Sequence, residues 1–291
     1  MTVTNKSTNS DGVALVTGSS SGFGLLASIE LARKGHRVFA TMRNLERGQR
    51  LREAAAKAGV DVEILQLDVT DSASIGAAVD EAVRRAGRID VLVNNAGFGL
   101  GGFAEDYTMA ELREQFETNF FGLVELTKAV IPIMREQGSG RIINVSSIMG
   151  LAAVPGMSAY CASKFAVEGF SEALRHELLP FGIYVTLVEP GTFRTDIFER
   201  NRRLADGAEC ESSPNYERGQ HIIGLADKHV ERTKSDPNTV AKLIARAATK
   251  RRPRLRYIVG IDARAQRLLK RVLPSRVMDT VVKAVTTPKA A

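Results

Sequence analysis

Tryptophan is absent from this chain of 291 residues, and cysteine is almost absent, with two residues. Cys161 and Cys210 are too few for a disulfide framework or a cysteine-rich metal site, and this scarcity favours a reducing compartment. No run of 18 or more apolar residues occurs, so we expect no membrane-spanning helix. The polar first residues lack the apolar segment of a secretory signal. These absences predict a cytoplasmic protein with no metal site.

Positive charge is concentrated in the last part of the chain. From Lys250 onward, twelve Lys and Arg stand against Asp262 and Asp279, a formal charge of +10, whereas the whole chain carries +7. A basic segment can bind an acidic partner or an anionic surface, but a solvated helix face gives the same pattern. No base-reading motif or aromatic stacking platform accompanies the charge. We therefore expect no nucleic-acid partner.

Short apolar runs alternate with helical periodicity along most of the chain. The runs cover residues 13–17, 36–42, 62–70, 89–97, 140–147, 183–191 and 256–260. Strands that alternate with helices of this kind predict βαβ units and a mainly parallel α/β sheet, doubly wound by helices on both faces. We expect one domain over residues 12–291 with a seven-stranded sheet, preceded by a flexible tail at 1–11.

The alternation fails after Gly191. Residues 192–237 are polar and uncertain in structure, and they follow the carboxyl end of a strand, where open α/β sheets bind ligands. We interpret this segment as a mobile substrate lid. Residues 250–291 then form a basic C-terminal extension.

One helix of this extension, at 262–274, is basic and amphipathic. Its apolar side chains share one face: Leu268, Leu269, Val272 and Leu273. Such a helix can lie on an anionic membrane. More often it packs on its own domain, which is the arrangement we expect here.

The first apolar run leads into the turn TGSSSGFG at 17–24. Glycines permit a tight bend and close backbone approach, and the following helix start presents free N–H groups and a positive dipole end to a pyrophosphate. The turn therefore predicts dinucleotide binding. The expected contacts are Gly18, Ser20, Ser21, Gly22, Phe23 and Gly24.

The stretch AYCASKFAVEGF at 159–170 places Tyr160 four residues before Lys164. On a helix both side chains lie on one face. A positive charge near a phenol favours the phenolate and lowers a pKa that is ordinarily about 10. Two polar residues on a solvated helix face would give the same pattern, so the pair alone does not decide.

The glycine turn, NNAG at 94–97, Asn119, Ser147, Tyr160 and Lys164 together resemble the short-chain dehydrogenase/reductase family, over roughly residues 12–197. The segments at 162–178, 188–197 and 252–260 look like its steroid- and retinol-type, NADP-preferring branch. The resemblance implies a Rossmann-type sheet in the order 3-2-1-4-5-6-7 and an oxidoreductase that interconverts an alcohol and a ketone or aldehyde. Family members are commonly dimers or tetramers, so we expect a homodimer or homotetramer.

The resemblance also implies catalytic roles. Ser147 would hold and polarise the substrate carbonyl, and Tyr160 would exchange a proton with its oxygen. Lys164 would lower the pKa of Tyr160 and hold the nicotinamide ribose. Asn119 would keep a water beside the lysine. Taken alone, Ser147 or Asn119 would more simply be a polar residue that bonds locally.

NADP(H) is the expected cofactor. The position where the family carries an acid for NAD is Met42, and the next residue is Arg43, whose guanidinium suits a 2′-phosphate. The basic residue that often marks NADP binding in the turn is replaced by Ser21. Further expected contacts are Asp68, Val69, Asn95, Ala96, Gly97, Pro190, Gly191, Thr192 and Thr195, besides Tyr160 and Lys164. Asp68 could alternatively cap a helix.

The expected substrate is a small apolar alcohol or carbonyl compound, such as a steroid or retinoid. The segments at 98–103 and 148–157 are apolar and glycine-rich, and they carry no arginine for a carboxylate. The same apolar residues could simply be packing. An alternative function is a catalytically idle nucleotide-sensing protein on the same fold.

Overall fold

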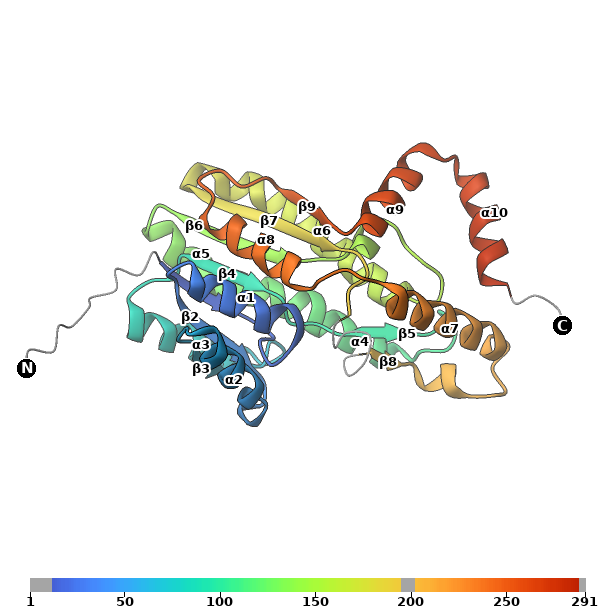
Figure 1. Ribbon diagram of the computed structural model, residues 1–291, viewed down its shortest axis with the longest axis horizontal. Coiled ribbons are helices and arrows are strands. Elements are labelled where there is room, and N and C mark those ends of the chain that lie inside the picture. Colours follow the sequence, from blue (N-terminus) through green and yellow to red (C-terminus); the bar gives the residue numbers. More distant parts are fainter. Residues whose placement is uncertain (1–11, 195–201, 288–291) are drawn as a thin grey trace, which may run out of the picture.

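The computed structural model describes residues 12–194 and 202–287. Its centre is a seven-stranded sheet in which every neighbouring pair is parallel, in the order β3-β2-β1-β4-β6-β7-β9 (Figure 1). Its strands are β1 (Val13–Val16), β2 (Arg37–Met42), β3 (Glu63–Gln66), β4 (Val91–Asn94), β6 (Gly140–Val145), β7 (Ile183–Pro190) and β9 (Arg256–Val259). The predicted single Rossmann-type domain and its strand order are confirmed, because β5 and β8 lie outside this sheet. The expected tail at 1–11 and Thr195 lie outside the described residues.

Helices cover both faces of the sheet. One face packs against α1 (Gly22–Arg33), α2 (Gln49–Ala58) and α8 (Asn238–Thr249). The other packs against α3 (Ser72–Ala86), α5 (Gly122–Glu136) and α6 (Ser158–Leu178). Alternate side chains of β1 point to opposite faces of the sheet. Ala14 and Val16 pack in the core on the first face, and Val13 and Leu15 pack in the core on the second. Continuous apolar strands are what a sheet buried on both faces requires.

The predicted helical stretch at 108–137 is one run with a defect in it. Helix α4 (Met109–Phe116) passes through a π-helical turn, Glu117–Phe121, into α5. Thr108 and Glu111 form a capping box that fixes where α4 begins. A π-turn re-aims the side chains it carries. Here it carries Asn119, which is buried.

The segment after Gly191 is more regular than expected. Its described part contains β8 (Arg202–Leu204), a 3₁₀ turn at Asp206–Glu209 and the helix α7 (Tyr216–Arg232). Strand β8 pairs in parallel with β5 (Gly99–Gly101) in a separate small sheet. The expected lid is therefore tied to the segment at 98–103 through backbone hydrogen bonds.

The chain closes with two helices instead of one, α9 (Ile261–Val272) and α10 (Ser275–Thr286). They project from one end of the molecule beside α7 (Figure 1). The expectation that the apolar face of α9 packs on the domain is wrong, because Leu268, Leu269 and Val272 are exposed. Within 12–194 and 202–287, no helix combines the length and the hydropathy needed to cross a membrane.

Candidate active site

The glycine turn brings α1 close to β4. Gly18 and Gly22 have φ angles of 66° and 55°, in the left-handed region, which favours glycine. A Cβ on Gly24 would lie 2.4 Å from the Gly18 carbonyl oxygen and 2.5 Å from Asn95 Nδ2. Ser21 caps α1 without a side-chain hydrogen bond. The first N–H groups of the helix are thus free to bind a ligand, and such a helix start suits a pyrophosphate.

Asparagine side chains brace this turn from the neighbouring strand. Asn95 Nδ2 donates to the carbonyl oxygens of Thr17 and Gly18, at 2.9 and 3.2 Å. The Ala96 N–H donates to Thr17 Oγ1 at 3.0 Å. Asn94 instead donates within the core, to Thr127 Oγ1 and Asn144 Oδ1. The NNAG segment therefore holds the turn to the sheet and leaves Ala96 and Gly97 on the wall of the adjoining cavity.

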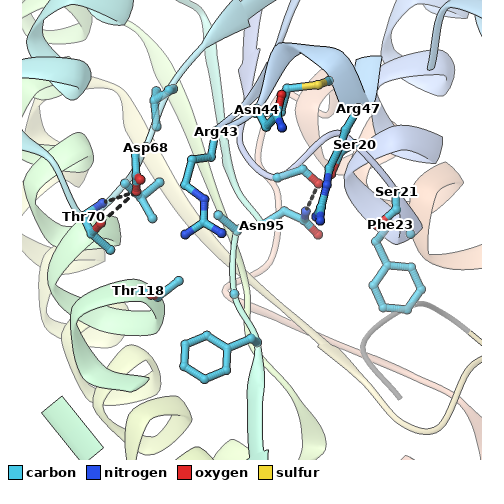
Figure 2. Close-up of a pocket in the computed structure, with 18 of the residues that line it drawn as sticks. Ser20, Ser21, Phe23, Arg43, Asn44, Arg47, Asp68, Thr70, Asn95 and Thr118 are labelled. Carbon is cyan, nitrogen blue, oxygen red and sulfur yellow. Dashed lines mark hydrogen bonds between the residues drawn. The ribbon is translucent and has the colours of Figure 1, made fainter. Parts of the chain in front are cut away.

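A cavity of about 510 Å³ opens in front of the turn (Figure 2). It contains nearly all the nucleotide contacts expected from the sequence: Gly18, Ser20, Ser21, Gly22, Phe23, Arg43, Asp68, Val69, Asn95, Ala96 and Gly97. Sequence reasoning missed other lining residues, among them Asn44, Arg47, Thr118 and Arg203. Gly24 lies behind the turn and not in this lining.

Arg43 and Arg47 give this cavity positive charge, whereas the third lining arginine, Arg203, is paired with Glu114. Arg43 directly follows β2, Arg47 belongs to the next 3₁₀ turn, and both point into the cavity (Figure 2). Asp68 Oδ1 accepts hydrogen bonds from the Thr70 N–H and hydroxyl, at 3.0 and 2.8 Å. The alternative role of Asp68 as a helix cap is wrong, because Asp71 caps α3.

A second cavity, of about 600 Å³, adjoins the first. The two share Phe23, Asn95, Gly97 and Phe98 in their linings. The second contains Ser147, Tyr160, Lys164, Pro190, Gly191 and Thr192. Its wall is otherwise mainly apolar, with contributions from Val154, Pro155, Met157, Ile222, Ile223, Val281 and Val285. Polar groups able to exchange protons thus line a mainly apolar cavity that adjoins a charged one.

Burial, and not its neighbours, decides the pKa of Tyr160. Its hydroxyl is hydrogen-bonded to Ser147, which lowers its pKa, but burial dominates and raises that pKa to about 12. Ser147 Oγ also accepts from the Met149 N–H at 3.1 Å. The shift opposes the expected lowering by Lys164, because loss of solvent outweighs the hydrogen bond.

Lys164 is buried and directed at the sheet. Its Nζ donates to the Val145 carbonyl oxygen at 2.9 Å and lies 5.8 Å from the centre of the Tyr160 ring. Burial lowers the pKa of Lys164 to about 8, against the opposing effect of Glu168. A lysine that titrates near neutral pH can change charge during turnover.

Asn119 holds the backbone of Phe98, a residue that lines both cavities. Its Oδ1 accepts from the Phe98 N–H at 3.1 Å, and its Nδ2 donates to the Phe98 carbonyl oxygen at 3.0 Å and to Ser163 Oγ at 3.2 Å. The alternative of local bonding within its own helix does not hold. The π-turn explains this geometry, because it directs Asn119 across to Phe98 and Ser163 instead of along its own helix.

A buried acidic pair that the sequence analysis missed lies behind the lysine. Glu168 is one turn beyond Lys164, and Glu189 lies in β7. Arg256 reaches both, with N–O distances of 3.1 Å to Glu168 and 3.3 Å to Glu189. Burial raises the pKa of Glu168, and it raises that of Glu189 to about 8, reinforced by the neighbouring Glu168 carboxylate. Within the described part of the chain, no cluster of His, Cys, Asp or Glu is suited to a metal ion.

Comparison with known proteins identifies the family. Residues 12–205 match the family model of the short chain dehydrogenases. An uncharacterized oxidoreductase of Bacillus subtilis is 43% identical over 274 residues, which cover 93% of this chain and 97% of the relative. A 3-ketodihydrosphingosine reductase of Bacteroides thetaiotaomicron is 40% identical, covering 85% of this chain and 87% of its own. Retinol dehydrogenase 8 of Bos taurus is 38% identical, with 83% and 79% covered, which fits the retinol-type branch.

Solved structures show the same fold. A short-chain dehydrogenase from Streptomyces avermitilis superposes with a TM-score of 0.77 at 37% identity, over 94% of both chains. A Burkholderia phymatum short chain dehydrogenase/reductase in complex with NAD gives 0.78 at 27%, over 96% and 98%. A metagenomic short-chain oxidoreductase in complex with NADP gives 0.67 at 27%, over 85% and 96%. The chain therefore belongs to the short-chain dehydrogenase/reductase family, whose members bind NAD or NADP.

Proposed function

We propose that this short-chain dehydrogenase/reductase is an NADP(H)-dependent oxidoreductase that interconverts an apolar alcohol with its ketone or aldehyde. The observation that carries the proposal is the hydrogen-bonded pair of Ser147 and Tyr160 in the apolar cavity, which adjoins the charged cavity. A carbonyl placed there meets a proton donor on one side and the nucleotide site on the other.

The chain's own residues handle the substrate oxygen and its proton. A bound nicotinamide supplies the hydride for reduction or takes it up in oxidation. The Ser147 hydroxyl holds the carbonyl oxygen, and Tyr160 donates a proton to it as it becomes an alcohol. A pKa of about 12 keeps Tyr160 protonated at neutral pH, which suits this acid role. Lys164, whose Nζ lies 5.8 Å from the centre of the Tyr160 ring, would restore the proton or bind ribose hydroxyls.

The glycine turn and the two arginines are proposed to hold NADP(H). The start of α1 would bind the pyrophosphate, and Arg43 and Arg47 would bind the 2′-phosphate. Position 42, where an acidic residue would favour the free 2′-hydroxyl of NAD, is a methionine. Similar solved structures are complexes with either NAD or NADP, so the preference rests on these side chains.

An apolar substrate is proposed from the wall of the second cavity. Two relatives are named for retinol and for 3-ketodihydrosphingosine, an apolar alcohol and a long-chain ketone. Assembly into a homodimer or homotetramer, the lid role of the segment after Gly191 and a cytoplasmic location stay predictions.

A carbonyl panel tests this function. NADPH oxidation is followed with steroid, retinoid and long-chain aliphatic carbonyls and, in parallel, with sugars and keto acids. The proposal expects turnover with at least one apolar class and a kcat/KM at least tenfold lower for the sugars and keto acids, which is about 1.4 kcal/mol of discrimination. NADPH binding without turnover of any carbonyl, or of any alcohol with NADP, would instead identify the idle nucleotide sensor.

A further inference from the structure

The apolar face of α9 points away from the protein. Its apolar residues recur at helical spacing: Ile261, Ala265, Leu268, Leu269 and Val272. Ile261 is 86% exposed, Leu268 60% and Val272 67%. Ala263 is the buried residue of this helix. Apolar side chains gathered on one exposed stripe mark a surface that a partner covers.

The polar side of α9 faces the body instead. Lys270 lies 4.9 Å from the centre of the Phe165 ring and donates to the Leu151 carbonyl oxygen. Asp262 accepts from the Thr192 N–H at 2.7 Å. These contacts fix the rotation of the helix about its axis. The outward orientation of Leu268 and Val272 therefore follows from what the opposite side binds.

Helix α10 continues this surface to the mouth of the apolar cavity. Val277, Val281 and Val285 are spaced four residues apart, and all three are exposed. Val281 and Val285 also line the cavity. The helix is held against α7, where His221 Nε2 lies 3.1 Å from the Val285 carbonyl oxygen. We call α9 and α10 together the C-terminal arm (Figure 1).

Charge distinguishes the kinds of partner that could cover this arm. Between Ile261 and Thr286 the chain has six Lys and Arg, against Asp262 and Asp279. The cations are Arg264, Arg267, Lys270, Arg271, Arg276 and Lys283. Within 12–194 and 202–287, none of these cations has a carboxylate at ion-pair distance. A symmetric dimer through the arms would bring two positive surfaces together, whereas an anionic bilayer matches both the charge and the apolar stripe.

We propose that the C-terminal arm docks on an anionic lipid membrane and places the mouth of the apolar cavity at the bilayer surface. The apolar side chains of α9 and α10 insert among the lipids, and the flanking cations bind the headgroups. On the function proposed above, an apolar substrate would then exchange between the bilayer and the cavity past Val281 and Val285. Docking itself requires no catalysis.

Vesicle flotation of the full-length protein tests the docking. The probes are vesicles of phosphatidylcholine alone and of phosphatidylcholine with phosphatidylglycerol. One variant combines Leu268→Gln with Val272→Gln, and a second combines Arg264→Gln with Arg271→Gln. Matched controls remove similar groups elsewhere: Leu45→Gln with Met109→Gln, and Lys34→Gln with Lys57→Gln. All four apolar targets are exposed, so folding is preserved.

The proposal expects the parent to float with anionic vesicles and to be released by high salt. Loss of the two arginines weakens binding about 25-fold, since each cation near an anionic surface contributes about a fivefold factor. Loss of Leu268 and Val272 weakens it at least about tenfold, and both controls bind like the parent. Failure to float with anionic vesicles, or equal binding by all variants, overturns the proposal.

Sedimentation of the same samples without lipid tests the alternative that a second copy of the chain covers the arm. If the parent is a dimer that binds no vesicles, and the Leu268→Gln, Val272→Gln variant is a monomer, then the arm covers another copy of the chain. The proposal would then be wrong. Carbonyl turnover in lipid-free buffer is measured alongside. A protein that turns over substrate but does not float refutes docking alone, and one that floats without turnover refutes the proposed function alone.

Discussion

Removal of the Arg43 guanidinium should change which nicotinamide cofactor the protein uses. Arg43 follows β2 directly and points into the charged cavity in front of the glycine turn (Figure 2). The change Arg43→Ala leaves Met42, whose side chain is buried in the core, in place. Fold and turn are therefore kept, while one cation facing the proposed 2′-phosphate is lost.

The size of the effect follows from a single charge-assisted contact. A hydrogen bond to a charged group contributes about 1.5–3 kcal/mol. The kcat/KM for NADPH should fall roughly 10- to 150-fold, because about 1.4 kcal/mol corresponds to tenfold. NADH has no 2′-phosphate, so its kcat/KM should change by less than about threefold. Arg47 lines the same cavity and limits the loss, so the double variant with Arg47→Ala should lose more than either single one.

Steady-state kinetics with both cofactors provide the assay. Arg43→Ala, Arg47→Ala and the double variant are compared with Arg52→Ala, which removes a cation from α2 outside the cavity lining. Raising the salt concentration should weaken NADPH binding in the parent more than in the double variant. Equal losses with NADPH and NADH, or an unchanged NADPH preference in the double variant, would refute this account of the cofactor.

Three further predictions test the site and its support. Burial raises the pKa of Glu189 in the folded protein from 4.5 to about 8. Between pH 4.5 and about 8 the folded chain therefore holds a proton that the unfolded chain has lost, so the free energy of unfolding falls as pH rises. Glu189→Gln should remove up to about 5 kcal/mol of this fall, measured by urea unfolding at a series of pH values; an unchanged slope would contradict it. The pKa of Lys164 is lowered to about 8, so carbonyl reduction should decline as pH rises through that value and the lysine loses its charge; a flat profile up to about pH 10 would argue against a charged Lys164. A Cβ on Gly122 would lie 2.2 Å from the Val69 carbonyl oxygen, whereas one on Gly76 meets nothing within 4 Å, so thermal melts should show Gly122→Ala destabilised by at least about 2 kcal/mol and Gly76→Ala unchanged or stabilised by about 0.5–1 kcal/mol.

The sheet and the glycine turn could be predicted because both are local. Each strand is a short apolar run, and the turn lies within residues 17–24. Helix α7 was not predicted, because none of its residues is buried and its apolar side chains Ile222, Ile223 and Ala226 line a cavity instead of packing in the core. The orientation of α9 also could not be predicted, because an amphipathic helix has the same sequence pattern whichever face it turns outward.

Features that depend on distant partners were the hardest to predict. Arg256 meets Glu168 across 88 positions of sequence, and no spacing rule connects them. Asn119 bonds to Phe98 because a π-turn interrupts the helix, which the helical periodicity of 108–137 does not reveal. The pKa of Tyr160 had the opposite shift from the one expected, since burial outweighs nearby charge and burial depends on the whole fold.

Turnover by the Tyr160→Phe variant tests the central claim most directly. The change removes one hydroxyl and keeps the ring that fills the site. With NADPH and the preferred apolar carbonyl, kcat should fall at least about 100-fold, the usual contribution of a general acid. The NADPH dissociation constant, from cofactor fluorescence on the same sample, should change less than about tenfold. Parental turnover by Tyr160→Phe would contradict the mechanism.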